Sequence, residues 1–290
     1  MLGHTIAPRL CPPVEGAICD THLHIYDPAF AYDPAAALQP PSATAADYVA
    51  VRQVLGVQRN VIVQPTTYGF DNRCTLDAVA RLGKANSRAV VVVPPSVSDE
   101  ALWCMHEAGA RGVRINALRG AALDPDSLSA LAQRIAHLGW HVQLHTDGAA
   151  LAELSPWLEQ LATPVVIDHM GRTERSLDPS SPTWHTLISL LARPHVWVKL
   201  SAPYLLQPDG APDYGALVPW VDALADTAGE RLLWGTDWPH PGWHAQGKAQ
   251  LDEVVLAAWA WQHLARRGLA QAALVDNPAR LYGFAPSTLR

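Results

Sequence analysis

Eight short apolar runs, spaced along almost the whole chain, constrain the fold more than any other feature of the sequence. Each run is rich in β-branched or other apolar residues, as buried strands are. The runs are Ala17–Tyr26, Asn60–Gln64, Ala89–Pro94, Gly112–Asn116, His141–His145, Pro164–His169, Val196–Ser201 and Arg231–Asp237. Some contain uninterrupted apolar stretches, such as Val90–Val93, which are typical of parallel strands buried on both faces. The sequence therefore predicts eight parallel strands.

Segments with helical spacing separate many of the successive runs. In one of them Leu128, Leu131, Ile135 and Leu138 recur every three or four residues, and Gly139 follows as a stop signal. Eight units of a strand followed by a helix are what a (β/α)8 barrel requires, and such a barrel takes about 250 residues. We therefore predict an α/β fold with one TIM-barrel domain over residues 1–290. A doubly wound open sheet is the alternative.

The composition is that of a globular protein with a large core, with 49% hydrophobic residues, 17% charged residues and eleven tryptophans. The net charge of −6 comes without a basic cluster, which argues against binding to nucleic acid or to an anionic membrane. The expected partner is a small molecule. The sequence gives no indication of the oligomeric state.

The four cysteines match neither a zinc motif nor a disulfide framework in their spacing. They are Cys11, Cys19, Cys74 and Cys104, and we expect reduced thiols. The first eighteen residues lack an apolar segment of the signal-peptide type, and no stretch approaches eighteen consecutive apolar residues. These features predict a soluble, cytoplasmic protein.

Two loops are expected from their proline and serine content. Pro28–Pro41 follows the first run and would lie over the mouth of a barrel. Ser176–Pro182 follows the sixth run. The first of these loops is therefore expected to contribute to the site.

Polar residues gather where the predicted strands end, and in TIM barrels the chemistry lies at that face. They are His22, His24, Arg114, Asn116, His145, His169 and Asp237. His22 and His24 are two residues apart, so they project from the same face of an extended strand. Imidazole and carboxylate groups are ligands for zinc or manganese. A set of this kind can hold a divalent ion, and it can also act without one.

Structural roles are the alternatives for single members of this set. A His-x-His pair can satisfy backbone groups at a barrel mouth, and His145 can be a hydrogen-bonded core histidine. Arg114 can pair with Asp168 instead of with a substrate. Lys199 either points into the barrel or is a structural lysine. The tertiary structure has to decide among these alternatives.

Seven short motifs are spread over nearly the whole chain. They are Asp20–His24, Asn60–Gln64 with Asp71–Asn72, Gly112–Arg114, Gly139–Val142, Ile167–Arg172, Trp234–Pro241 and Asn277–Tyr282. In this order they resemble the amidohydrolase superfamily, specifically the amidohydrolase-related branch of 2-pyrone-4,6-dicarboxylate lactonases and D-galactarolactone isomerases. The resemblance implies a TIM barrel that hydrolyses a carboxylated lactone.

The resemblance also implies roles for individual residues. Asp237 matches the general base that activates water. Three histidines match the groups that polarise the lactone carbonyl, namely His22, His24 and His169. Arg114 matches the clamp for a substrate carboxylate, a role that suits its bidentate fork. Asn72 and His240 lie in matched motifs and are expected to bind substrate as well.

Three departures from the family pattern affect the predicted substrate. Leu205 stands where an arginine is expected after the seventh strand. Arg119, also expected to bind substrate, lies one residue short of the second arginine of the fourth strand. Leu38–Pro41 occupies the place of an expected tyrosine, for which Tyr32 comes too early. A lactone with one carboxylate, such as a sugar-acid lactone, needs fewer cationic anchors, so we expect it to be preferred over a doubly charged pyrone.

A fourth departure concerns metal binding. At the end of the fifth strand the metal-free lactonase has a tyrosine and the isomerase a glutamine, whereas this chain has His145. A histidine there is the usual metal ligand in the wider superfamily. The resemblance therefore implies a mononuclear zinc or manganese site formed by His22, His24, His145, His169 and Asp237. A site that works without metal is the alternative.

Three functional interpretations follow from these residues. In a lactone hydrolase, Asp237 activates water; in a lactone isomerase, a substrate hydroxyl attacks the carbonyl and no water is consumed. A barrel that binds ligands without catalysis is the third interpretation. The isomerase has asparagine at the position of Asp237 and lacks an intact His-x-His. The sequence therefore favours the hydrolase.

Overall fold

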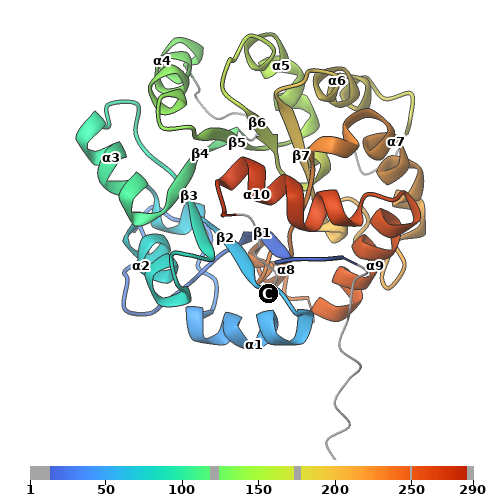
Figure 1. Ribbon diagram of the computed structural model, residues 1–290, viewed down its shortest axis with the longest axis horizontal. Helices are drawn as coiled ribbons and strands as arrows, with labels where there is room; N and C mark the ends of the chain where they lie inside the picture. The colour runs from blue at the N-terminus through green and yellow to red at the C-terminus, as the bar shows by residue number, and fades with distance from the viewer. Residues whose placement is uncertain (1–13, 118–123, 173–177, 249, 286–290) are drawn as a thin grey trace, which may run out of the picture.

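Eight parallel strands form the centre of the molecule, and helices surround them (Figure 1). The computed structural model describes residues 14–117, 124–172, 178–248 and 250–285. Each strand pairs in parallel with the next one along the chain, from β1 to β8. A parallel bridge between Leu23 and Trp238 joins the ends of the sheet. The predicted TIM barrel is confirmed.

The strand positions agree with the apolar runs of the sequence. The strands are β1 Cys19–Leu23, β2 Arg59–Val63, β3 Ser87–Val91, β4 Ala110–Ala117, β5 His141–Thr146, β6 Val165–Ile167, β7 Val196–Leu200 and β8 Leu232–Trp234. Every strand overlaps the run predicted for it. Hydrophobic periodicity alone was therefore sufficient to locate the barrel.

The helices follow the strands in the expected alternation. They are α1 Ala45–Leu55, α2 Arg73–Leu82, α3 Asp99–Ala108, α4 Pro125–Ala136, α5 Gly148–Leu158, α6 Pro182–Leu191, α7 Val218–Ala228, α8 Pro241–His244, α9 Glu253–Arg266 and α10 Asn277–Tyr282. Helix α1 begins with a capping box between Thr44 and Asp47. Helix α4 begins at Pro125 after Asp124, whose carboxylate accepts from two backbone N–H groups. Residues close to each N-terminus in the sequence therefore determine where these two helices begin.

Two apolar regions hold the barrel together. Side chains such as Val61, Val90 and Leu233 fill the barrel interior, and Tyr282 and Phe284 of the C-terminal segment pack against them. Figure 1 shows α10 lying across the centre of the ring of strands. A larger apolar layer fills the space between the strands and the surrounding helices. The C-terminal segment thus closes one end of the barrel, and the other end remains for the site.

The loop Pro28–Pro41 contributes to the barrel mouth as predicted. Leu38 lines the cavity there, and the Tyr32 hydroxyl donates to the Pro40 carbonyl at 2.9 Å. The other predicted loop, Ser176–Pro182, lies partly outside the described residues, and α6 begins at Pro182. The first loop therefore forms part of the wall of the site.

Cys19, Cys74 and Cys104 are free thiols, and Cys11 lies outside the described residues. A search of the described ranges found no helix with the length and apolar character that crossing a membrane requires.

A candidate active site at the carboxyl ends of the strands

A cavity of about 270 Å³ opens at the carboxyl ends of the strands. It brings together residues from loops that are far apart in the chain. Its lining is His24, Tyr26, Leu38, Pro65, Thr66, Arg114, His145, Asp147, His169, Arg172, Leu205, Asp237, Pro241, Gly242 and Gln246. Five of the residues predicted at strand ends are in this lining. The structure thus places them in one cavity.

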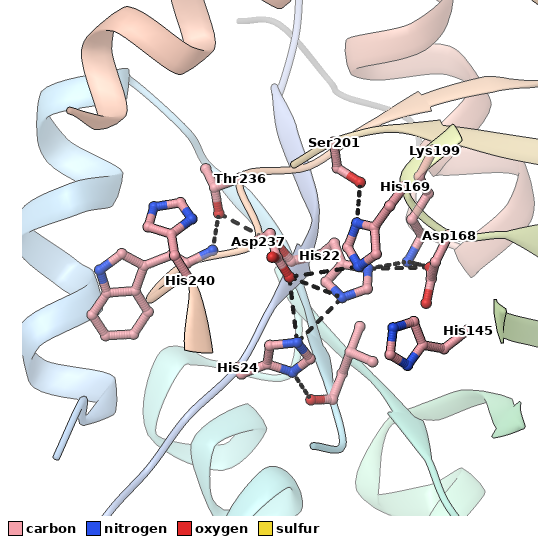
Figure 2. Close-up of polar contacts among 12 residues, drawn as sticks. His22, His24, His145, Asp168, His169, Lys199, Ser201, Thr236, Asp237 and His240 are labelled. Carbon is pink, nitrogen blue, oxygen red and sulfur yellow. Dashed lines mark hydrogen bonds and ion pairs between the residues drawn. The ribbon is translucent and has the colours of Figure 1, made fainter. Parts of the chain in front are cut away.

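Asp237 lies at the centre of three imidazoles, as Figure 2 shows. Its Oδ1 atom is 3.5 Å from Nε2 of His22, 3.5 Å from Nε2 of His24 and 3.8 Å from Nε2 of His169. The Nε2 atoms of His22 and His24 are 3.3 Å apart. All four side chains are buried. These four predicted site residues therefore form one compact cluster.

The contacts at Nδ1 of the two β1 histidines bear on which ring nitrogen carries the hydrogen. Nδ1 of His22 lies 3.2 Å from a carboxylate oxygen of Asp168, and Nδ1 of His24 lies 2.8 Å from the Val63 carbonyl. The Val63 carbonyl only accepts, so Nδ1 of His24 carries the hydrogen and its Nε2 presents a lone pair. Nδ1 of His22 also lies 3.2 Å from Nζ of Lys199, which only donates, so this nitrogen faces one acceptor and one donor. Burial lowers the pKa of His22 and keeps its ring neutral. A neutral ring has its hydrogen on one nitrogen only, and a metal at the cluster would require the His22 hydrogen on Nδ1 and the lone pair on Nε2.

The donor set fits a divalent cation. Two Nε2 atoms and one carboxylate oxygen face one another at 3.3–3.5 Å. A hydrogen between the two Nε2 atoms holds them together in the absence of a metal, and a cation between the three atoms would take the place of that hydrogen. Ligands of tetrahedral zinc, with bonds of about 2.0–2.1 Å, lie roughly 3.3 Å from one another. His22, His24 and Asp237 therefore have the atom types and spacing of three metal ligands. A second triad of His22, Asp168 and His169 has its possible ligand atoms within 4.8 Å of one another.

His169 and Asp237 both follow their strands in the left-handed backbone region, with φ angles of 51° and 64°. This conformation costs a residue with a side chain roughly 1–3 kcal/mol, so the surrounding contacts must hold it. His169 Nδ1 contacts the Ser201 hydroxyl at 2.9 Å, and burial lowers the pKa of His169 to about 4. The ring is therefore neutral near pH 7.

The Asp237 carboxyl is ionised in this environment. Burial by itself would raise its pKa, but His169, His24 and His22 lower it to well below the usual range. A buried carboxylate of this kind is able to accept a proton from water held at Oδ1. Asp237 therefore has the charge state that a general base requires.

A second network lies beside the imidazole cluster (Figure 2). Lys199 is fully buried, and its Nζ donates to the Thr21 carbonyl at 2.8 Å and to Gln143 Oε1 at 2.7 Å. Nζ also lies 3.6 Å from Asp168. Burial lowers the pKa of Lys199 to about 8. Of the two alternatives left by the sequence, Lys199 thus points into the barrel.

Arg114 pairs with Asp168 and also reaches the cavity, where its role as a substrate clamp stays a prediction. Its Nη2 lies 3.4 Å from Asp168 Oδ2, as in the structural alternative, and Nη1 lies 3.3 Å from the Gln64 carbonyl. Arg114 also lines the cavity, and its Nε has no hydrogen-bond partner within the described part of the chain. Burial would raise the pKa of Asp168, but His22, Lys199 and Arg114 hold it well below the usual range.

His145 lies in the cavity wall, apart from the compact cluster. Its Nδ1 lies 3.3 Å from Asn116 Oδ1, and its Nε2 lies 3.0 Å from Nη1 of Arg172. Arginine only donates, so the Nε2 lone pair is directed at Arg172 rather than at a shared metal position. Neither of the metal-compatible triads found among the described residues includes His145. The structure thus brings four of the five predicted metal ligands together.

Two predicted substrate contacts, Asn72 and His240, make hydrogen bonds with protein groups. The Asn72 side chain donates to the carbonyls of Phe70 and Val92 and accepts from the Val92 N–H at 2.9 Å, so it holds the loop after β3. His240 is buried and contacts other side chains through both ring nitrogens. Arg119 lies outside the described residues.

Sequence reasoning missed several side chains that contact the predicted ones. Arg172 lines the cavity, and its place three residues after His169 was a usable signal. Tyr204 directly precedes Leu205 and donates to Asp237 Oδ2. Glu253, at the start of α9, contacts His240. No sequence pattern links Glu253 to β8, since only the folded chain brings them together.

The arrangement of this site agrees with a comparison with known families. The amidohydrolase family model matches residues 19–284, which include every strand and all four clustered residues. The chain belongs to the amidohydrolase family. This confirms the resemblance seen in the seven motifs.

Known proteins are similar to this chain over most of its length. A 4-sulfomuconolactone hydrolase from Hydrogenophaga intermedia is 35% identical over 272 residues, covering 91% of this chain and 88% of that protein. A 2-pyrone-4,6-dicarboxylate hydrolase from Comamonas testosteroni is 37% identical over 281 residues, covering 92% and 90%. A D-galactarolactone isomerase from Agrobacterium fabrum is 30% identical over 274 residues, covering 94% and 92%.

Proposed function

We propose that this amidohydrolase is a hydrolase that opens a carboxylated lactone with water activated by Asp237. The observation that carries the proposal is the ionised Asp237 carboxylate held among three imidazoles in a cavity. The names of two relatives, both lactone hydrolases, support the reaction class.

Substrate binding is assigned to the charged part of the cavity lining. Arg114 and Arg172 both line the cavity, and a guanidinium fork suits a carboxylate. His145, which accepts from Arg172, orients that arginine. Leu205 contributes an apolar surface to the same cavity. A lactone with one carboxylate matches this lining.

The catalytic step follows from the cluster geometry. Asp237 Oδ1 accepts a proton from water as the water oxygen attacks the lactone carbonyl. With the Ser201 hydroxyl donating to Nδ1 of His169, the Nε2 of that ring carries the hydrogen and stabilises the oxyanion. Collapse of the tetrahedral intermediate breaks the ring C–O bond, and Asp237 returns its proton to the leaving oxygen. The carboxylic acid product then ionises in solution.

A divalent cation is part of the proposal, with His22, His24 and Asp237 as its ligands. When bound, zinc or manganese would supply Lewis-acid polarisation at this position. With the hydrogen of each ring on Nδ1, Asp168 and Val63 would hold the Nε2 lone pairs of His22 and His24 in place, which is the usual way in which metal-binding imidazoles are oriented.

The proposed function is tested with a panel of sugar-acid, muconolactone and pyrone lactones. Turnover of each lactone is measured by pH-stat as the rate at which base is consumed. Hydrolysis of a lactone releases one proton at neutral pH because the carboxylic acid product ionises, whereas isomerisation of one lactone to another releases none. We expect steady base consumption with at least one carboxylated lactone. Product formation without base consumption would instead identify an isomerase, the activity of one relative. Absence of turnover with every lactone would contradict the proposal.

Elemental analysis of protein purified without added metal tests the cation. We expect close to one equivalent of zinc or manganese in the wild type and in His145→Asn, because His145 is directed at Arg172. His24→Asn should lose most of the metal, since it removes a lone pair from the triad. Metal loss in His145→Asn would restore the five-ligand prediction. Less than about a tenth of an equivalent in the wild type, with chelator-insensitive activity, would show that the site works without metal.

A further inference from the structure

The two oxygens of the Asp237 carboxylate have different surroundings. Oδ1 faces the three imidazoles at 3.5–3.8 Å, and no one of these contacts is short. Oδ2 accepts a hydrogen bond of 2.5 Å from the Tyr204 hydroxyl. The terminal torsion of an aspartate is broad, so the contact at Oδ2 determines which oxygen faces the cavity.

Tyr204 is itself held by a chain of contacts that leads away from the cavity. Its hydroxyl lies 3.0 Å from Nδ1 of His240, and Nε2 of His240 lies 2.6 Å from Oε1 of Glu253. Tyr204 and His240 are buried, and the Glu253 side chain is 16% exposed. The contacts therefore extend continuously from Asp237 to the start of α9.

The donor directions in this chain are consistent. Tyr204 has one hydrogen, and the nearer, charged acceptor is Asp237. The Tyr204 oxygen is then free to accept from Nδ1 of His240, while Glu253 accepts from Nε2. Each member thus holds the next, and Glu253 and Asp237 place negative charge at the two ends.

Three separate segments supply these residues. Tyr204 belongs to the short helix Pro203–Leu205 after β7, His240 directly precedes α8, and Glu253 is the first residue of α9. Asp252 caps α9 through two backbone N–H groups, which fixes the position of Glu253. In Figure 2, His240 and His145 lie on different sides of Asp237. Tyr204, His240 and Glu253 thus support Asp237 from outside the cavity.

We propose that Tyr204, His240 and Glu253 are positioning residues, which hold Oδ2 of Asp237 so that Oδ1 stays directed at the attacking water. This rests on the proposed function, because it requires Asp237 to be the base. The described part of the cavity lining contains none of the three side chains. Their effect on catalysis is therefore transmitted through Asp237 and involves no contact with substrate.

Tyr204→Phe removes one hydroxyl and tests the first link. We expect kcat to fall roughly tenfold to a hundredfold because the base loses its fixed orientation, with KM within about threefold of wild type. Tyr214→Phe is the matched control. Tyr214 is also fully buried, and its hydroxyl has no hydrogen-bond partner in the described ranges, so its removal should leave kcat unchanged.

A double-mutant cycle tests whether Glu253 acts through Tyr204. Glu253→Gln alone should lower kcat by roughly threefold to tenfold, because it weakens the hold on His240. In the Tyr204→Phe background the same change should alter kcat by less than about twofold, since the link to Asp237 is already broken. Equal effects in the two backgrounds would show that Glu253 has a separate, structural role. That result would overturn the proposal that Glu253 acts through Tyr204.

Crystal structures of the wild type and Tyr204→Phe give a readout that needs no substrate. We expect the Asp237 carboxylate to rotate, or to occupy two orientations, in the variant only. If no lactone is turned over, the proposed function fails, and this comparison still decides the positioning. Three results for Tyr204→Phe would each overturn the proposal: an Asp237 carboxylate in its wild-type orientation, a kcat equal to that of Tyr214→Phe, or a raised KM with unchanged kcat.

Discussion

Asp237→Asn is expected to reduce kcat by about 10²–10⁴-fold, because an amide of the same shape cannot take a proton from water. The reduction should be larger if metal binding is lost as well. The amide oxygen can still accept from Tyr204, so we expect the variant to fold. The measurement is kcat by pH-stat on the best lactone, together with the thermal midpoint and metal content of each protein.

Asp222→Asn is the matched control for this change. Asp222 lies in α7, its side chain is 44% exposed, and its nearest ion-pair partner is Arg267 at 3.9 Å. It should keep wild-type kcat, since exposed ion pairs at this distance contribute little. A folded Asp237→Asn protein that retained most of its activity would assign the base to another group.

The charge of the preferred substrate is expected to depend on Arg114. Arg114→Lys should lower kcat/KM for a monocarboxylated lactone by roughly tenfold to a hundredfold, because lysine cannot form the two-pronged contact. Each charge-assisted hydrogen bond is worth about 1.5–3 kcal/mol. Arg193→Lys is the control, since the Arg193 side chain is 51% exposed and pairs with Glu159 on the surface. Its kcat/KM should match that of the wild type.

Leu205 provides the complementary test in the same cavity. The wild type should prefer a monocarboxylated lactone over the pyrone dicarboxylate, because Leu205 offers no charge to a second carboxylate. Leu205→Arg should raise kcat/KM for the dicarboxylate by roughly tenfold, through one added charge-assisted contact. Efficient hydrolysis of the dicarboxylate by the wild type would show that another cation already binds the second carboxylate. Arg172, which lines the cavity, would then be the first residue to substitute.

The fold could be predicted in detail from the sequence because its signals are local. An apolar run indicates a strand that is buried on both faces. Apolar runs that alternate with segments of helical spacing indicate the barrel. The same reasoning located His22, His24, His169 and Asp237, since residues at strand ends meet at one face whatever the loops do. The structure places these four together.

The surroundings of those residues were decided by tertiary contacts. His145 satisfied the strand-end rule, but the backbone at η2, His169–Arg172, places Arg172 against its Nε2. Asn72 lay in a matched motif, yet its amide holds the backbone of Val92. Strand-end position specifies which side chains reach the mouth of the barrel. It does not specify which hydrogen bond each of them makes there.

By itself the sequence determined the barrel and the four clustered residues, because strand periodicity and strand-end chemistry are encoded within short stretches of chain. The order of seven short motifs indicated the family, through their resemblance to known amidohydrolases. Only the tertiary structure decided that Lys199 points inward, that Arg114 pairs with Asp168, and that Tyr204 reaches Asp237. These contacts join groups that are between 33 and 178 residues apart in the chain. Their geometry depends on how several loops pack around one cavity, and no local pattern records that packing.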